Sequence, residues 1–211
     1  YWYPLYAYLR RTGYRPDDAE DLIQGFFLYL LEGQILRSVE REGGRFRSFL
    51  LGTLKHFVSD QQDKASAQKR GGGRSLISWD LAQAEHRFLR EPADEESPDR
   101  LYERRWASVL LERAMERLQQ EWVCAGKADL FARLKGFVSG EKGLASYAEA
   151  AEQANLSPSA LKSAIFRLRR RYHELVREEV AHTVADPREL KEELRYLLSL
   201  FSSGQGVKCR T

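Results

Sequence analysis

The stretch NLSPSALKSAIFRLRRRYHEL, residues 155–175, combines a turn, a helix start and a run of arginines. Ser157 followed by Pro158 predicts that a helix begins here, because the hydroxyl can cap free amides and proline suits the first helical position. The apolar positions that would face a core are Leu161, Ile165, Leu168, Tyr172 and Leu175. Their spacing of three or four residues puts them on one buried stripe of an amphipathic helix.

The opposite face of this helix is polar and cationic. It carries Ser159, Lys162, Ser163, Phe166, Arg167 and Arg170. Immediately upstream, in SYAEAAEQANLS, Ser146 is followed three residues later by Glu149, which predicts a capping box at the start of a short helix. Two helices joined by a tight turn, the second with a basic outer face, are typical of a helix-turn-helix DNA-binding unit. The same pattern also fits an ordinary helical hairpin with a solvated basic face.

Composition places the chain among globular proteins. It has 211 residues, 43% of them hydrophobic, a formal net charge of +3 and a pI of about 8.8. A nucleic-acid surface must therefore come from local clusters of cations such as residues 167–171. Cys124 and Cys209 lie far apart, which argues against a disulfide framework or a zinc site and favours a reducing compartment. No apolar run reaches membrane-spanning length and no signal peptide is present, so we expect a cytoplasmic protein without a membrane partner.

Nearly every apolar pattern has the helical period, which predicts an all-α protein. A first helical domain is expected over residues 1–69, and a second, which contains the helix-turn-helix, over residues 100–182. Between them, residues 70–99 include RGGGRS and REPADEESPD, whose glycines and like charges predict a flexible linker. We therefore expect two small helical domains joined by a flexible linker.

Two helices of the first domain carry polar faces of their own. In PDDAEDLIQGFFLYLLEG, residues 16–33, Asp18, Asp21 and Gln24 lie apart from the apolar stripe, and the helix dipole and solvation alone would explain them. In residues 44–70, the face opposite the apolar stripe carries Arg45, Arg47, Ser48, Lys55 and His56. Cations interleaved with aromatic residues suit phosphate pairing and base stacking on single-stranded or distorted nucleic acid. A core stripe with a soluble basic face would give the same pattern.

In motif order and approximate spacing, the two domains resemble a bacterial RNA polymerase sigma factor of the sigma-70 family, and more narrowly the short extracytoplasmic-function (ECF) group. DAEDLIQ is similar to the segment of sigma region 2 that docks on the clamp helices of the polymerase β′ subunit. The resemblance implies polymerase binding by Asp18, Asp21, Gln24 and Phe27. GRFRSFLLGTLKHFVSD resembles the segment that opens and reads the minus-ten promoter element. This implies DNA contacts for Arg45, Arg47, Ser48, Lys55 and His56, with the REGGR loop near the extruded base.

The helix-turn-helix resembles sigma region 4, whose second helix enters the major groove at the minus-thirty-five element. The resemblance assigns this contact to Ser157, Ser159, Lys162, Ser163, Phe166, Arg167 and Arg170. It also implies binding to the polymerase β flap and control by an anti-sigma or other regulatory protein. By position along the helix, residues 162–167 should reach base edges, while Arg169, Arg170 and Arg171 should lie nearer the phosphates.

The C-terminal extension, residues 183–211, lies outside the two regions of the resemblance. Asp186 and Pro187 predict the start of an amphipathic helix, with a leucine stripe that needs a partner surface. The stripe is formed by Leu190, Leu194, Leu197 and Phe201. This helix could pack on the second domain, or mask a DNA-binding or polymerase-binding face.

The expected function is that of a transcription initiation factor, which directs core RNA polymerase to promoters and has no enzymatic activity of its own. No cofactor and no metal are expected, because the four histidines are scattered and neither cysteine has a partner at ligand spacing. Three alternatives remain open. They are a stand-alone helix-turn-helix regulator of duplex DNA, a helical adaptor that binds proteins only, and a metal-dependent nuclease that uses the carboxylates of residues 16–33.

Overall fold

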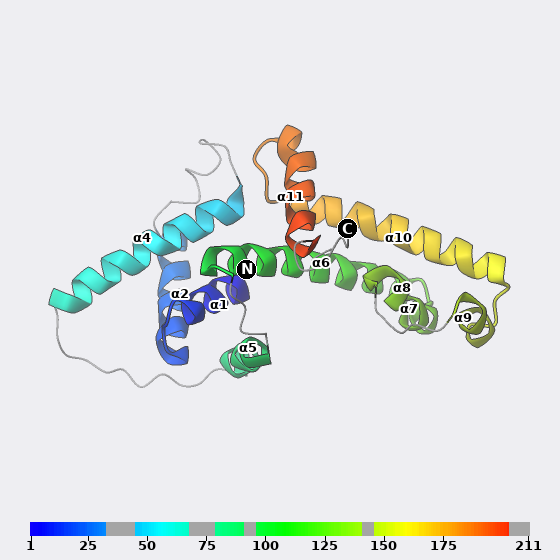
Figure 1. The fold of residues 1–211 in the computed structure, drawn as a ribbon, viewed down its shortest axis with the longest axis horizontal. Coiled ribbons are helices and arrows are strands. Elements are labelled where there is room, and N and C mark those ends of the chain that lie inside the picture. The colour runs from blue at the N-terminus through cyan, green and yellow to red at the C-terminus, as the bar shows by residue number, and fades with distance from the viewer. Residues whose placement is uncertain (33–44, 68–78, 91–95, 141–145, 203–211) are drawn as a thin grey trace, which may run out of the picture. The chain divides into compact units, whose positions relative to one another are not determined.

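The computed structural model of the chain describes residues 1–32, 45–67, 79–90, 96–140 and 146–202 (Figure 1). In these ranges the regular structure is helical, with one isolated β-bridge, which confirms the prediction of an all-α protein. The chain divides into two compact units. Unit 1 comprises Tyr1–Val109 and Thr183–Thr211, and unit 2 comprises Leu110–His182.

Unit 1 begins with α1 (Trp2–Arg11), α2 (Pro16–Glu32) and α4 (Phe46–Ala67). Between α1 and α2, Gly13 has a φ of 102°, a left-handed conformation that glycine adopts without steric penalty. The three helices bury apolar residues in a common core. This core includes Leu5, Leu9, Ile23, Phe26, Leu50 and Leu54. For α2 the sequence predicts an inward stripe of Leu22, Phe26, Phe27 and Leu30. Phe26 and Leu30 are buried as expected, but Leu22 and Phe27 are only half-buried and Ile23 is buried instead.

Helix α5 (Trp79–Arg90) lies within the segment predicted to be a flexible linker. Its Leu81 and Ala84 are buried, and Glu85 accepts hydrogen bonds from Tyr6 Oη at 2.6 Å and Arg10 Nε at 2.9 Å. The linker prediction is wrong for these residues, because an amphipathic helix here has an apolar face that packs on α1. Residues 68–78 and 91–95, which contain the glycines and most of the like charges, lie outside the described residues.

Helix α6 (Pro98–Cys124) contributes to both units. In unit 1 it buries Tyr102 and Trp106, and the Trp106 ring stacks on that of Tyr1 with centroids 4.4 Å apart. The Tyr102 hydroxyl donates to the carbonyl of Arg47 at 3.0 Å. The second compact unit consequently starts at Leu110 rather than at the predicted residue 100, since the aromatic side chains of α6 complete the core of unit 1.

The described part of the C-terminal extension belongs to unit 1. The amide of Phe46 donates to the carbonyl of Thr183 at 3.0 Å, and Arg45 forms the β-bridge with Val184. Asp186 caps a short 3₁₀ turn, η1 (Pro187–Glu189), before α11 (Leu190–Ser202). The predicted helix start is confirmed, with a tighter first turn than expected. Residues 203–211 lie outside the described residues.

Unit 2 contains the rest of α6 together with α7 (Ala128–Leu134), α8 (Gly136–Ser139), α9 (Tyr147–Gln153) and α10 (Pro158–Ala181). Its core includes Leu118, Phe131, Leu134, Leu161, Leu168 and Leu175. Tyr172 of the predicted stripe is only half-buried, because its hydroxyl reaches out to donate to the carbonyl of Leu111 at 3.2 Å.

Candidate functional site

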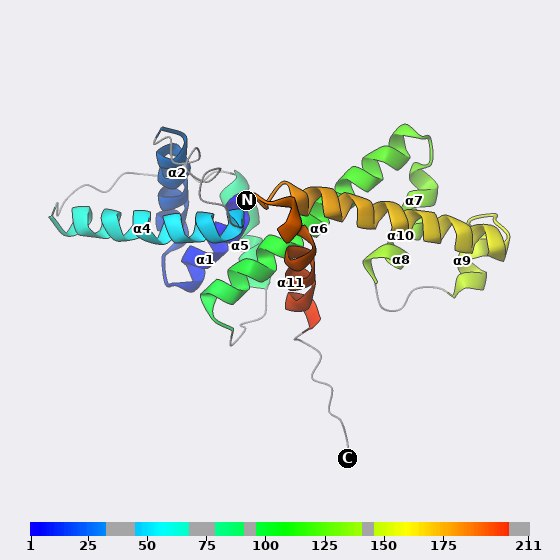
Figure 2. The same ribbon diagram turned by 90° about the horizontal axis from the view of Figure 1, so that it is seen from above.

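Helices α9 and α10 form the helix pair predicted from the sequence (Figure 2). In the turn between them Asn155 has a φ of 52°, a left-handed conformation that asparagine tolerates better than most residues. Ser146 and Glu149 close a capping box through hydrogen bonds of 2.8 and 3.2 Å. Ser157 Oγ accepts from the amide of Ala160 at 3.2 Å. Both predicted caps are confirmed, and together with the turn they fix where α10 begins.

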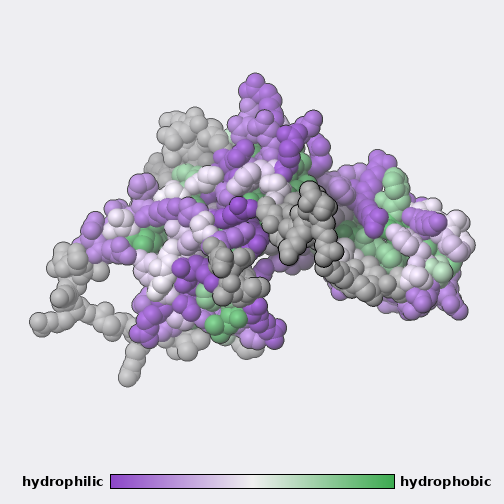
Figure 3. All heavy atoms as spheres, viewed as in Figure 1, coloured by the Kyte–Doolittle hydropathy of each residue, from purple (hydrophilic) through white to green (hydrophobic). Residues whose placement is uncertain are grey.

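The outer face of α10 is the solvent-exposed side of its first four turns. Its members are Ser159, Lys162, Ser163, Phe166, Arg167 and Arg170. Phe166 is 68% exposed, and Figure 3 shows hydrophobic residues interspersed with hydrophilic ones where α9 and α10 lie. The prediction that these side chains share one exposed face is confirmed, while their contact with DNA stays a prediction. Ser157, which was assigned to the same contact, uses its hydroxyl as the helix cap.

The arginines that follow this face do not act as one set. Arg169 donates from Nε and Nη2 to the carbonyl of Phe137 at 3.0 and 2.8 Å, and so ties α10 to α8. The Arg170 side chain is 73% exposed and makes a 3.2 Å ion pair with Glu174, one turn further along. Of these two arginines, only Arg170 keeps the open position that a phosphate contact needs.

Arg171 belongs to a charged network inside unit 2. It lies 2.7 Å from Glu121 and 3.3 Å from Glu178, while Arg117 pairs with Glu178 at 2.6 Å and Glu179 at 2.8 Å. The hydrogen bond from Arg171 lowers the pKa of Glu121, and the bond from Arg117 lowers the pKa of Glu178. Arg171 is therefore already paired with a carboxylate of α6, while its expected place near the phosphates stays a prediction.

The carboxylates of α2 border a groove between α2 and α4. Asp18 and Asp21 are exposed and line this groove, which has a volume of about 620 Å³. Gln24 borders a separate pocket beside α1, and its Nε2 donates to Glu20 Oε1 at 3.3 Å. Phe27 is half-buried, with its ring 5.8 Å from that of Phe26.

These four residues, predicted to bind polymerase, do not form one patch. An α-helix turns by about 100° per residue, so Asp18 and Phe27 project from opposite sides of α2. Asp18 and Asp21 border the same groove, and Gln24 follows Asp21 by three positions on the neighbouring part of the helix surface. Phe27 is the residue that lies farthest around the helix from Asp18.

Helix α4 carries the residues predicted to contact the minus-ten element. Ser48 and His56 are exposed and Arg45 is partly exposed, but Arg47 is only 2% exposed. The prediction that Arg47 lies on the outward face is wrong, because other parts of unit 1 cover its side chain. Of the REGGR loop, residues 41–44 lie outside the described residues.

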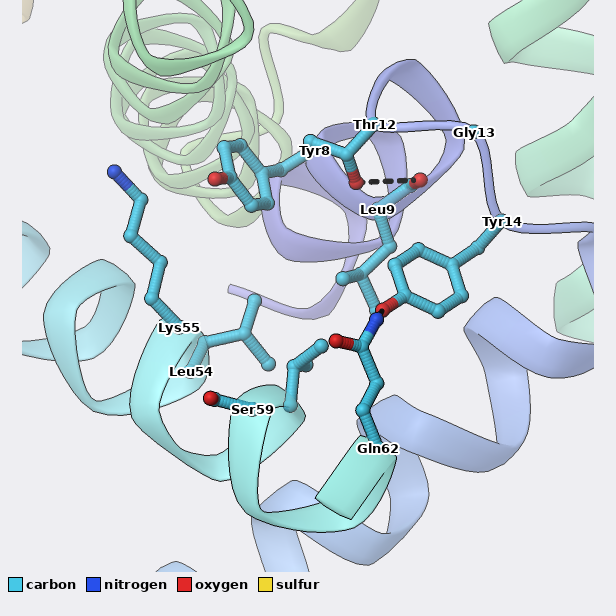
Figure 4. Close-up of a pocket in the computed structure, with 10 residues that line it drawn as sticks. Tyr8, Leu9, Thr12, Gly13, Tyr14, Leu54, Lys55, Ser59 and Gln62 are labelled. Atoms are coloured by element: carbon cyan, nitrogen blue, oxygen red, sulfur yellow. Dashed lines mark hydrogen bonds between the residues drawn. The ribbon is translucent and has the colours of Figure 1, made fainter. Parts of the chain in front are cut away.

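Lys55 lies at the edge of a pocket between α1 and α4, with a volume of about 400 Å³ (Figure 4). Its ammonium pairs with Asp99 at 2.7 Å and lies 5.7 Å from the ring centroid of Tyr8. In the same pocket Gln62 donates to the hydroxyl of Tyr14. Lys55 is thus exposed, as predicted, but it already has an anionic partner.

Arg45 and Arg47 are held by α11 in what we call the arginine cluster. Glu193 lies 2.7 Å from Arg45 Nε and 3.4 Å from Arg47 Nε. The guanidinium carbons of the two arginines lie 5.6 and 4.6 Å from the ring centroid of Tyr196. Glu103 of α6 lies 3.8 Å from Arg47 and accepts a hydrogen bond from the Tyr196 hydroxyl. One carboxylate and one aromatic ring of α11 therefore serve both arginines.

Sequence reasoning missed Glu193, Tyr196 and Glu103. The Glu193 side chain is 0% exposed, and burial raises the pKa of its carboxyl although the neighbouring arginines act in the opposite direction. The signal was present in the sequence, since Glu193 falls within the leucine stripe of α11. A carboxylate in the apolar stripe of a helix must be buried with that stripe, and a buried carboxylate requires a cation beside it.

No group of three or more metal-ligating side chains that could hold a metal ion is found in the described residues. Cys124 is an exposed free thiol, while Cys209 lies beyond the part of the chain that the structure describes. None of the helices in that part combines the length and the apolar character needed to cross a bilayer.

Comparison of the chain with protein-family models, with curated proteins and with solved structures finds no match.

Proposed function

We propose that this chain is a transcription initiation factor of the sigma type, which binds core RNA polymerase through α2 and promoter DNA through α10. The outer face of α10 is the observation that carries the proposal. There Phe166 stands exposed between Lys162 and Arg167. Single exposed apolar residues are common on protein surfaces, but this one stands among cations and hydroxyls at the start of a capped helix.

Each group on this face suits a particular feature of duplex DNA. Lysine and arginine pair with the acceptor edge of guanine, and an apolar ring suits the methyl group of thymine. The small hydroxyl side chains of Ser159 and Ser163 allow close approach to the groove. Arg170, one turn further along and more open to solvent, is placed to pair with a phosphate. A recognition helix needs base contacts near its start and phosphate contacts beyond them.

The groove beside α2 supports the polymerase half of the proposal. Asp18 and Asp21 place two carboxylates along its rim, which favours a partner segment that carries cations. The motif DAEDLIQ, which resembles the polymerase-docking segment of sigma region 2, supplies both carboxylates.

The test is a titration of core RNA polymerase with the chain carrying Asp18→Ala and Asp21→Ala. We expect the double substitution to raise the dissociation constant by about tenfold, because both lost charges border the same groove. The matched control carries Asp17→Ala and Asp60→Ala, which remove one first-turn carboxylate and one other exposed carboxylate of the same unit.

Equal affinities of the two double variants would contradict polymerase docking on α2. If the unaltered chain binds duplex DNA alone and shows no affinity for polymerase, the stand-alone regulator replaces the initiation factor as the better interpretation. Transcription from a bound promoter by the reconstituted polymerase would support the proposal directly.

A further inference from the structure

The arginine cluster of unit 1 pairs two cations with groups that nucleic acid would also offer them. We infer that α11 is an intramolecular mimic of single-stranded DNA, with Glu193 in the place of a backbone phosphate and Tyr196 in the place of a base. The inference rests on the proposed function, because it takes Arg45 and Arg47 as DNA contacts of the minus-ten segment. It adds that the chain's own C-terminal helix covers them.

The chemistry of the cluster matches that of single-strand recognition. Proteins that bind single strands pair phosphates with cations and stack bases on aromatic rings or guanidinium planes. Arg45 meets a carboxylate oxygen at 2.7 Å, and Arg47 lies 4.6 Å from the Tyr196 ring centroid. Glu193 and Tyr196 are three positions apart on one helix, so they project from the same side and reach both arginines together.

The ion pairs of the cluster are poorly suited to a purely structural role. Within the described residues, neither Glu193 oxygen makes a hydrogen bond, and burial raises the pKa of this carboxyl. A buried ion pair without good hydrogen bonds adds little to stability, because desolvation offsets the attraction. The apolar burial of Leu197 and Leu200 is what holds α11 in place. The charged contact instead makes the docking selective for the two arginines.

A nucleic-acid strand can replace this contact without leaving the arginines unpaired. A phosphate keeps its negative charge at neutral pH and accepts charge-assisted hydrogen bonds from guanidinium groups. Leu198 and Phe201 remain exposed on α11, so the helix buries only part of its apolar surface when docked. A helix held by few buried side chains opens locally at low free energy, and a strand that binds the freed arginines draws the equilibrium toward the open form.

Two neighbouring glutamates of α11 provide a matched test in the intact 211-residue chain. Glu193→Gln and Glu192→Gln remove one negative charge at adjacent positions of α11, but Glu192 is exposed. The probe is a fluorescent oligodeoxythymidylate of about 12 nucleotides, long enough to span a single-strand site. We expect Glu193→Gln to lower its dissociation constant about tenfold, because removing one partner of a buried pair leaves Arg47 with an uncompensated charge and so raises the open fraction. Glu192→Gln should change the dissociation constant less than twofold.

A second substitution tests whether the tighter oligonucleotide binding of Glu193→Gln depends on the arginines. Combining Glu193→Gln with Arg45→Ala should abolish most of the tighter binding, because one of the uncovered cations is then missing. Tighter binding that persists in the double variant would mean that the lost charge acts at a distance, and would overturn the proposal.

Hydrogen exchange of the unaltered chain tests the same proposal without a substitution. Saturating oligonucleotide should speed the exchange of the α11 amides several-fold while leaving those of α1 unchanged. Because it needs no variant, this measurement still tests whether the strand displaces α11 if Glu193→Gln prevents folding. Unchanged α11 exchange, or equal affinities of the Glu193 and Glu192 variants, or no oligonucleotide binding by any of these proteins, overturns the proposal.

The outcome is separable from that of the proposed function. A chain that binds core polymerase but whose α11 does not respond keeps the initiation-factor assignment and loses the mimic. If the chain does not bind polymerase but Glu193→Gln tightens oligonucleotide binding, the initiation-factor proposal fails and the inference that α11 mimics single-stranded DNA stands.

Discussion

Replacing Arg171 with alanine should destabilise unit 2 far more than replacing Arg170, although the two arginines are adjacent in the sequence. Arg171 lies 2.7 Å from Glu121, 3.2 Å from Glu174 and 3.3 Å from Glu178. Arg170 makes one ion pair, with Glu174 on its own helix. The first substitution therefore removes an ion pair between α10 and α6 together with two pairs along α10, and the second removes only one exposed pair within α10.

The expected magnitudes follow from the number and exposure of these pairs. An exposed ion pair contributes roughly 0.2–1 kcal/mol, so the three pairs of Arg171 should together contribute about 1.5 kcal/mol. The Arg171 side chain is 36% exposed against 73% for Arg170, which reduces solvent screening of its pairs. The single pair of Arg170 within one helix should contribute about 0.3 kcal/mol.

Hydrogen exchange of the α10 amides measures the opening free energy of unit 2 in both variants. Arg171 lowers the pKa of Glu121, so its contribution is fully present above the ordinary glutamate pKa and is lost as the pH falls through the lowered value. The difference between the two variants should shrink over that acidic range. Equal opening free energies at neutral pH, or a difference independent of pH, would refute the assignment of Arg171 to this network.

Three further predictions concern the Ser157 cap, the outer face of α10 and the docking of α5. Ser157→Ala should cost about 1 kcal/mol of unfolding free energy in urea titrations, while Ser159→Ala, which removes no cap, should have little effect. With polymerase present, Arg167→Ala should weaken promoter binding by roughly 1–3 kcal/mol and relax preference at one base position. Arg170→Ala should instead reduce the salt slope by about one unit for every sequence. Equal, sequence-independent losses of binding free energy for both arginine variants would mean that α10 offers only a basic face and does not read the DNA sequence. A hydrogen bond from Arg10 lowers the pKa of Glu85, so acidification through that lowered value should reduce the protection factors of the α5 amides in the unaltered chain but not in Glu85→Gln. A pH response that survives in the variant would assign it to another group.

Local signals were enough to predict the helix starts and the exposed face of α10. The caps at Ser146, Ser157 and Asp186 each depend on hydrogen bonds between residues within one turn, so the local sequence is sufficient to predict them. The periodicity of α10 likewise separated its buried stripe from its outer face. These features needed no knowledge of distant parts of the chain.

The misplaced residues depend on partners that lie far away in the sequence. Arg47 is a charged residue at a position outside the apolar stripe of α4, so the local sequence predicts that it faces solvent. It is buried only because α11, far away in the sequence, places Glu193 against it. Helix α5 was hidden between segments of glycine and like charge that dominate the composition of its region. The three arginines 169–171 read as one basic run, while their partners lie in α8, α6 and α10 itself.

Unit 1 is discontinuous, since it is built from the beginning and the end of the chain with unit 2 between them. During synthesis, helices α1, α2 and α4 leave the ribosome long before Thr183 and α11 exist to complete them. Contacts of such large sequence separation are slow to form, because the intervening chain must be closed into a loop first. A growing chain therefore presents Arg47 without its carboxylate partner, and unit 2 is ready to fold before unit 1 can be finished. In refolding experiments, protection of the α10 amides should accordingly precede protection of those in α11, and α11 should set the time at which the arginines of α4 are withdrawn from solvent.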